Sequence, residues 1–137
     1  MKPIKTVEVF GDRMDFIVDG AMSHGTALVI VQTSPPGGGP PPHSHSREDE
    51  TFTVREGEFE FLSDGEWIKA PVGELLFGPR GKVHAFRNVG KTDSRIAIVI
   101  PPAGMETFFE KLSGLRIPAD IPRIQQLFAQ YGLTLHG

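Results

Sequence analysis

The sequence contains no cysteine, which excludes disulfide bonds, thiolate metal ligands and thiol catalysis. It has no cluster of lysine and arginine, and its net charge is −3, whereas nucleic-acid-binding proteins carry a basic footprint. The longest apolar stretch, residues 27–31, is far too short to span a membrane, and the first residues lack the apolar core of a signal peptide. We therefore expect a cytoplasmic protein that binds neither nucleic acid nor membranes.

The length of 137 residues predicts one domain over residues 1–137. A chain of this size buries roughly two thirds of its unfolded surface, so it can build its own core. The composition, 39% hydrophobic and 23% charged, is ordinary for a globular protein. Nothing in it indicates a repeat or an extended disordered segment.

Glycine and proline are abundant, with 16 and 12 residues, which is typical of many short strands joined by tight turns. Asp64-Gly65 is a type I′ hairpin signal between two alternating segments. Alternation and β-branched residues predict strands at 6–10, 26–33, 50–55, 58–63, 67–70, 74–77, 83–87 and 95–100. We predict an all-β fold, a closed barrel or a jelly roll of two antiparallel sheets, with its core at about residues 26–100.

After Pro101-Pro102 the apolar period changes from two to that of a helix. Met105, Phe108 and Leu112 share one helical face, and Ile124, Leu127 and Tyr131 share another. The sequence therefore predicts two short C-terminal helices within a tail of about residues 103–132, packed on the barrel or on a partner. Residues 34–42 (SPPGGGPPP) resemble a linker, but too few residues precede them to form a domain, so we expect an extended arm.

Three of the five histidines and one glutamate have the spacing of a mononuclear metal site. His43 and His45, two residues apart on one strand, point to the same face. Glu50 stands at odd spacing from His45 and needs a turn between them, which the polar residues 46–49 can provide. His84 approaches from a neighbouring strand. Three imidazoles and one carboxylate leave two of six octahedral positions open, which suits a divalent transition metal such as Fe, Mn, Ni, Co, Cu or Zn.

The same residues lie in two motifs that resemble those of the cupin family. The first, G-x5-H-x-H-x4-E-x6-G, is matched from Gly37 to Gly57, and the second, G-x5-P-x-G-x2-H-x3-N, from Gly73 to Asn88. Fifteen residues separate the motifs, and the resemblance covers about residues 26–100. It implies a jelly-roll barrel and one metal ion held by four ligands: His43, His45, Glu50 and His84.

Within that family, the stretch PPHSHSREDETFTVREGEFEF is similar to small quercetinase-like proteins. This resemblance implies a metal-dependent dioxygenase acting on a small aromatic or enol substrate, with Glu50 as both metal ligand and catalytic base. Two alternatives remain open. One is an O2-independent isomerase or decarboxylase, which would want a cation in the pocket, for which the candidates are Arg55, Arg80 and Arg87. The other is a non-catalytic small-molecule-binding protein.

Other residues carry weaker expectations. Glu48 and Asp49 should be solvated or paired with Arg47 or Arg55, while His24 should be exposed in a turn and His136 should lie in a frayed terminus. Asn88 should act as a strand-end residue that bonds to the backbone. Most of the strand phenylalanines should be core, and one or two should line the pocket: Phe52, Phe59, Phe61, Phe77 and Phe86. Open sheet edges and the resemblance favour a homodimer, formed through the N-terminal strand and the tail helices.

Overall fold

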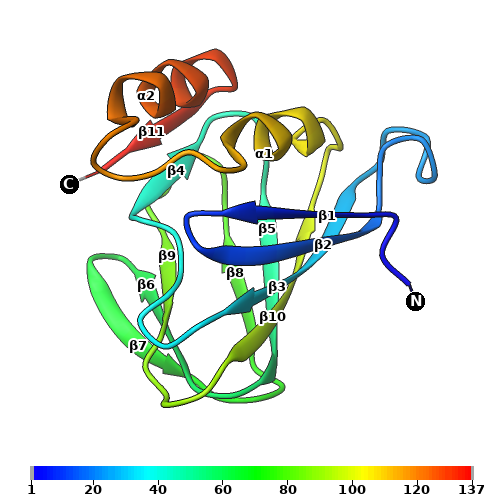
Figure 1. The fold of residues 1–137 in the computed structure, drawn as a ribbon. Helices are drawn as coiled ribbons and strands as arrows, with labels where there is room; N and C mark the ends of the chain where they lie inside the picture. Colours follow the sequence, from blue (N-terminus) through cyan, green and yellow to red (C-terminus); the bar gives the residue numbers. More distant parts are fainter. Residues whose placement is uncertain (1, 137) are drawn as a thin grey trace.

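A computed structural model of the protein describes residues 2–136 and shows a β-barrel with two helices at one end (Figure 1). One wall is a six-stranded antiparallel sheet in the order β1-β2-β3-β10-β5-β8. Its strands are β1 (Lys5–Val9), β2 (Asp12–Val18), β3 (Leu28–Ser34), β10 (Ser94–Ile100), β5 (Glu50–Glu56) and β8 (Leu75–Gly78). The predicted all-β class with short C-terminal helices is confirmed.

The second wall combines two small sheets. One pairs β11 (Leu133–Leu135) with β4 (His43–His45), and the other has the order β7-β6-β9, formed by Glu66–Ala70, Phe59–Ser63 and Ala85–Asn88. A single antiparallel bridge between His43 and His84 joins them. The predicted hairpin is present between β6 and β7, since Asp64 and Gly65 have φ values of 51° and 79°.

Two strands were missed by the sequence interpretation. β2 escaped notice because Asp12 and Asp15 interrupt its apolar alternation, yet both are buried. Asp12 accepts hydrogen bonds from the side chains of Gln32 and Ser34, which offset the cost of burying it. β11 has only three residues and is stabilised by its pairing with β4 rather than by its own sequence pattern.

The arm at residues 34–42 is not extended throughout, which corrects the sequence prediction. It begins with a turn in which the Gly38 amide donates to the Pro35 carbonyl at 2.8 Å. The arm then lies against β9, where the Gly37 amide donates to the Asn88 carbonyl and the Asn88 amide to the Gly38 carbonyl. Gly39 passes so close to the Phe86 carbonyl that a β-carbon would collide with it. The arm is therefore a docked part of the barrel wall.

Both helices, α1 (Glu106–Leu112) and α2 (Ile121–Gln130), pack on the barrel. Their apolar side chains belong to the same buried core as the strands, with contributions from Phe108, Phe109, Leu112, Ile124, Leu127 and Phe128. No helix within residues 2–136 is long and apolar enough to cross a membrane. The apolar faces of the helices are thus used within the chain, while β1 remains an edge strand; the homodimer itself stays a prediction.

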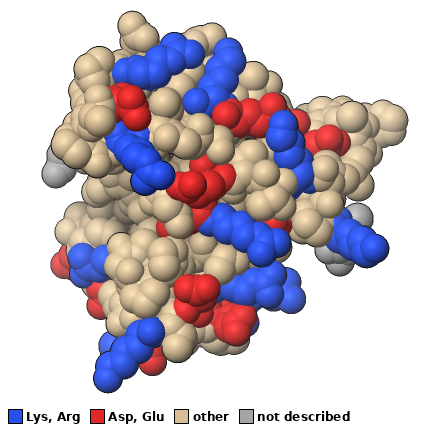
Figure 2. Space-filling view, in the orientation of Figure 1, with Lys and Arg blue, Asp and Glu red and all other residues tan. Residues whose placement is uncertain are grey.

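The face of the molecule seen in Figure 2 carries basic and acidic side chains side by side, without a continuous basic patch. Phe77, which the sequence placed in the core or pocket, is instead 58% exposed on the edge strand β8. Its neighbour Leu75 is also exposed, because these two residues face outward from the six-stranded sheet while Leu76 faces inward. The side chains of β8 therefore alternate as predicted, but the buried face is that of Leu76 and not that of Phe77.

Replacing Phe108 with alanine should lower the free energy of unfolding by about 3–5 kcal/mol. The side chain is 1% exposed and packs against Phe109, Phe128 and Tyr131, so its removal leaves a cavity between the helices and the barrel. The matched control is Phe77→Ala on the exposed edge. Urea denaturation measures both, and equal losses of stability in the two variants would contradict this packing.

Candidate metal centre

The three-residue strand β4 aims two imidazoles into the barrel. Its burial alternates, so that His43 and His45 are buried and Ser44 between them is less so. The strand is held on both sides, by β11 along its length and by His84 at one end. His84 itself is fixed by reciprocal backbone hydrogen bonds with His43, at 2.9 and 3.1 Å. Two distant segments of the sequence are thus locked together at the histidines.

Glu50 reaches the same place after a break in the chain. β4 ends at His45, residues 46–49 form no strand, and β5 begins at Glu50. This irregular segment resets the alternation, as the odd spacing required. On the other side, Gly81 adopts a φ of 84° and donates its amide to the His45 carbonyl at 2.6 Å, which closes the turn before His84.

The four side chains form one compact cluster. His43, His45, Glu50 and His84 are each at most 8% exposed, and one nitrogen or oxygen from each lies within 4.8 Å of all the others. The Glu50 carboxylate oxygen Oε1 lies 2.5 Å from Nε2 of His45 and 3.2 Å from Nε2 of His84. The structure thus brings together every residue that the sequence proposed for the metal.

Hydrogen bonds to the far ring nitrogens select the tautomer of two of these histidines. Nδ1 of His43 donates to the Pro41 carbonyl at 2.8 Å, and Nδ1 of His45 lies 3.3 Å from Oε1 of Glu48. Because Nδ1 holds a proton in each ring, Nε2 is the nitrogen that remains to bind an ion in the cluster. Nε2 of His45 is buried without a hydrogen bond of acceptable geometry to any described residue. A buried ligand atom is left without a partner in this way when its metal ion is absent, so these residues fit a metal site.

The electrostatics of the cluster are strongly coupled. Burial lowers the pKa of His43 to about 3, and the neighbouring His84 and His45 add to this effect. Burial also works against a charge on His45, but Glu50 and Glu48 raise its pKa to about 9. Burial opposes ionisation of Glu50, yet His45 and His84 hold its pKa well below the usual value. The metal-free cluster at neutral pH therefore contains an ionised Glu50, a neutral His43 and a protonated His45.

Metal binding should consequently release a proton from His45. Since its pKa is about 9, we expect the apparent affinity for a divalent metal to rise about tenfold per pH unit from pH 7 and to level off near pH 9. Titration calorimetry in buffers of different ionisation enthalpy would count the released proton. An affinity that is constant from pH 7 to pH 9 would contradict this protonation state.

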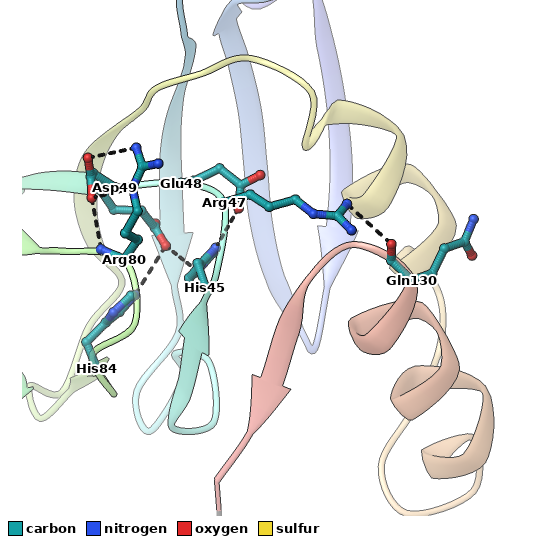
Figure 3. A network of polar contacts seen from close by, with 8 residues as sticks. His45, Arg47, Glu48, Asp49, Arg80, His84 and Gln130 are labelled. Carbon is teal, nitrogen blue, oxygen red and sulfur yellow. Dashed lines mark hydrogen bonds and ion pairs between the residues drawn. The ribbon is translucent and has the colours of Figure 1, made fainter.

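Glu48 differs from its sequence prediction. It is 7% exposed rather than solvated, and its carboxylate contacts His45 instead of Arg47 or Arg55. Asp49 pairs with Arg80 at 3.1 Å, and Arg47 donates to the Gln130 carbonyl at 3.4 Å (Figure 3). The irregular conformation of residues 46–49 turns the two adjacent carboxylates in opposite directions, one toward the cluster and one toward the surface.

We expect Glu48→Ala to weaken metal binding about 10–100-fold, as loss of a carboxylate behind a histidine ligand typically does. The reason is that His45 loses the partner that keeps its proton on Nδ1. Competition with a chelator measures the affinity, and nitrogen-15 NMR of the imidazoles reports the pKa of His45 in the metal-free protein, which Glu48 helps to raise. Asp49→Ala is the matched control, because Asp49 points at Arg80. An unchanged metal affinity together with an unchanged His45 pKa in Glu48→Ala would refute the role.

The cluster faces a small cavity of about 50 Å³. Apart from the four clustered residues and Gln32, its described walls are mostly aromatic and aliphatic, with Phe52 and Phe86 from the predicted set and Phe10, Phe108, Phe109 and Phe128 from elsewhere. Phe59 and Phe61 are buried in the core outside this lining. The described residues that line the cavity include none of the three candidate cations, Arg55, Arg80 and Arg87.

The remaining polar candidates have structural places. His24 is exposed in a turn, as expected. His136 is not frayed: its amide donates to the Pro42 carbonyl at 2.9 Å, and its Nε2 lies 3.0 Å from the Ser44 hydroxyl, outside the cluster. Asn88 donates its side-chain amide to the carbonyls of Ser34 and Thr92, the backbone role expected of it.

The antiparallel barrel encloses a buried cluster of three histidines and one glutamate. These features place the protein among small β-barrel proteins whose interior can hold a metal ion. Residues 30–101 match the family model described as Cupin domain, and the chain belongs to the cupin family. A Thermotoga maritima crystal structure, described as a predicted oxalate decarboxylase, has 25% identity and a TM-score of 0.66, covering 74% of this chain and 93% of that one.

Two curated relatives are similar over part of the chain. Quercetin 2,3-dioxygenase of Bacillus subtilis is 28% identical over 103 residues, which cover 74% of this chain and 30% of that protein. The oxalate-binding protein of Thermotoga maritima is 30% identical over 80 residues, covering 58% and 66% respectively. The chain spans less than two thirds of the length of the curated relatives it matches first.

Proposed function

We propose that His43, His45, Glu50 and His84 hold one divalent transition metal ion and that the protein is a dioxygenase-like enzyme acting on a small enol or phenol. The observation that carries this proposal is the convergence of three imidazoles and one carboxylate on an apolar-walled cavity. When bound, the metal would supply a Lewis-acid centre and, if redox-active, one-electron chemistry for O2. The similarity to a quercetin dioxygenase supports the same reading.

The cavity walls favour a neutral substrate over a dicarboxylate. A small di-acid such as oxalate would bring two negative charges into an apolar cavity where Glu50 already balances half the charge of a divalent metal, so part of the negative charge would be buried without a partner, which is costly. The described lining offers no lysine or arginine to balance them. Molecular oxygen and an uncharged enol carry no such cost. The O2-independent alternative therefore finds support in the oxalate-related relatives but not in the cavity of this chain.

Glu50 would have the proton-accepting role. Its carboxylate is ionised and buried, and it is the sole acidic group that lines the cavity among the described residues. A general base must lie within about 3.2 Å of the hydroxyl oxygen whose proton it takes. The Phe52 and Phe86 rings beside it would keep bulk water away from the substrate's reacting atoms.

Elemental analysis of the purified protein combined with oxygen-electrode traces tests this proposal. We expect about one transition metal per chain and oxygen uptake with enediols or flavonols, and no uptake after the metal is removed with a chelator. The protein loaded with redox-inactive Zn²⁺ is the control for binding without redox chemistry. Stoichiometric metal with no oxygen uptake on any enediol or flavonol would overturn the dioxygenase proposal and favour a binding protein.

A further inference from the structure

A second, larger hollow opens on the surface next to the cavity. It is a groove of about 550 Å³, bounded by the β1–β2 turn, the proline-rich arm, strands β7 and β9, and the loop between the two helices. In Figure 1 these segments meet on the side where β9, the arm and the tip of the β1–β2 hairpin lie together. Its main side chains are Phe10, Pro40, Pro41, Trp67, Arg87 and Arg116.

The groove and the cavity share part of their walls. Phe10, Pro40 and Phe86 line both. The two spaces also differ greatly in size. Pockets that bind small molecules usually measure 300–1,000 Å³, a range that includes the groove but not the cavity of about 50 Å³. A substrate larger than a few atoms must therefore leave most of its body outside the cavity, and the groove is the adjoining space.

The backbone at Phe10 is strained. Phe10 and Gly11 form the two-residue turn of the β1–β2 hairpin with φ values of 52° and 86°, a conformation that favours asparagine or aspartate followed by glycine. A bulky aromatic residue with positive φ is rare and concentrates at functional sites. Here the strain keeps a phenyl ring at the boundary between groove and cavity, where an asparagine would leave the boundary polar.

One wall of the groove holds a preformed stack of Arg87 on Trp67. The Arg87 guanidinium lies 3.9 Å from the centre of the Trp67 ring, and two hydrogen bonds to Glu60, at 2.7 and 2.9 Å, fix it there. Arg116, at another wall, forms no salt bridge with any of residues 2–136. A flat ring system with acidic hydroxyl groups matches both features, since the ring can stack and a phenolate can approach Arg116.

We propose that this groove is the outer part of the substrate site and takes the flat aromatic body of a phenolic substrate, stacked on Trp67, while its reacting enol enters the cavity past Phe10. This assignment rests on the proposed function for the identity of the inner site. The binding step at Trp67 does not depend on the metal, and it can therefore be measured in metal-free protein.

Trp67 is the only tryptophan of the chain, so its fluorescence reports the occupancy of the groove. Metal-free protein is titrated with quercetin, with free N-acetyltryptophanamide correcting for absorption by the flavonol. We expect saturable quenching. Calorimetry should show about tenfold weaker quercetin binding to Trp67→Ala and near-normal binding to Trp67→Phe, which keeps a stacking ring. Ile68→Ala, on the same strand outside the groove, should bind normally.

The outcomes separate this assignment from the proposed function. Saturable quenching of the wild type, together with calorimetric affinity that needs an aromatic residue at position 67 but without oxygen uptake by the metal-loaded protein, supports the groove and overturns the dioxygenase. Oxygen uptake with unchanged quercetin affinity in Trp67→Ala keeps the dioxygenase and overturns the groove. Absence of saturable quenching also overturns the groove. Circular dichroism of each variant shows whether its fold is intact.

Discussion

Replacing His45 with alanine is expected to remove most of the bound metal. Its Nε2 faces the Glu50 carboxylate and has no hydrogen-bond partner of acceptable geometry among the described residues, so it can bind an ion once its proton is released. The loss in affinity should exceed the 10–100-fold that removing an outer-shell partner costs, because a ligand atom itself disappears. Elemental analysis after reloading with excess metal measures the occupancy.

His24→Ala is the control for this experiment, because His24 is exposed in a turn away from the cluster. The His45 variant also leaves Glu48 and Glu50 buried without their common partner, which lowers stability. Circular dichroism must therefore show that the variant is folded before its metal content is compared. Equal occupancy in the two variants would remove His45 from the metal site.

The second large effect is expected for Glu50→Gln. Glutamine keeps the shape and one oxygen for the metal, but it carries no charge and is a far weaker base. We expect oxygen uptake at matched metal content to fall by a factor on the order of 10² or more, as removal of a general base typically causes. The variant should also bind metal more weakly, which is why the comparison needs matched loading.

Oxygen-electrode rates, divided by the measured metal content of each protein, compare Glu50→Gln with the wild type. The neighbouring Asp49→Asn removes a carboxylate one residue away that bonds to Arg80 rather than to the cluster, and it should keep normal turnover. Wild-type turnover in Glu50→Gln at equal metal content would show that this carboxylate is not the base. The metal assignment would then stand on affinity measurements alone.

The cluster was predictable from the sequence because its geometry follows from spacing. Side chains two residues apart on one strand share a face, and the polar break before Glu50 resets the alternation, as β4 and β5 show. The hairpin at Asp64-Gly65 was likewise readable, since few residue pairs favour two positive φ angles in succession. These features depend on local geometry, which a sequence pattern records directly.

Other features depend on contacts that no local pattern records. Residues 46–49 have no regular period, so no sequence pattern could show that Glu48 turns inward while Asp49 turns outward. β2 accommodates the buried Asp12 because Gln32 and Ser34, some twenty residues away, donate hydrogen bonds to its Oδ2. The groove at Trp67 is assembled from several separate segments, and only their packing reveals it.

The pairing of β4 with β11 has a consequence for biosynthesis. Leu133 lies opposite His45, and Leu135 opposite His43, so the strand that carries two of the four clustered groups gains its ladder partner from the last element of the fold. Translation delivers residues in order, and the ribosome has already released His43 and His45 when it is still adding residues 133–135. Until residues 133–135 have emerged, a nascent chain can pair β4 only through the bridge from His43 to His84, so the wall that carries the two histidines is completed late in folding.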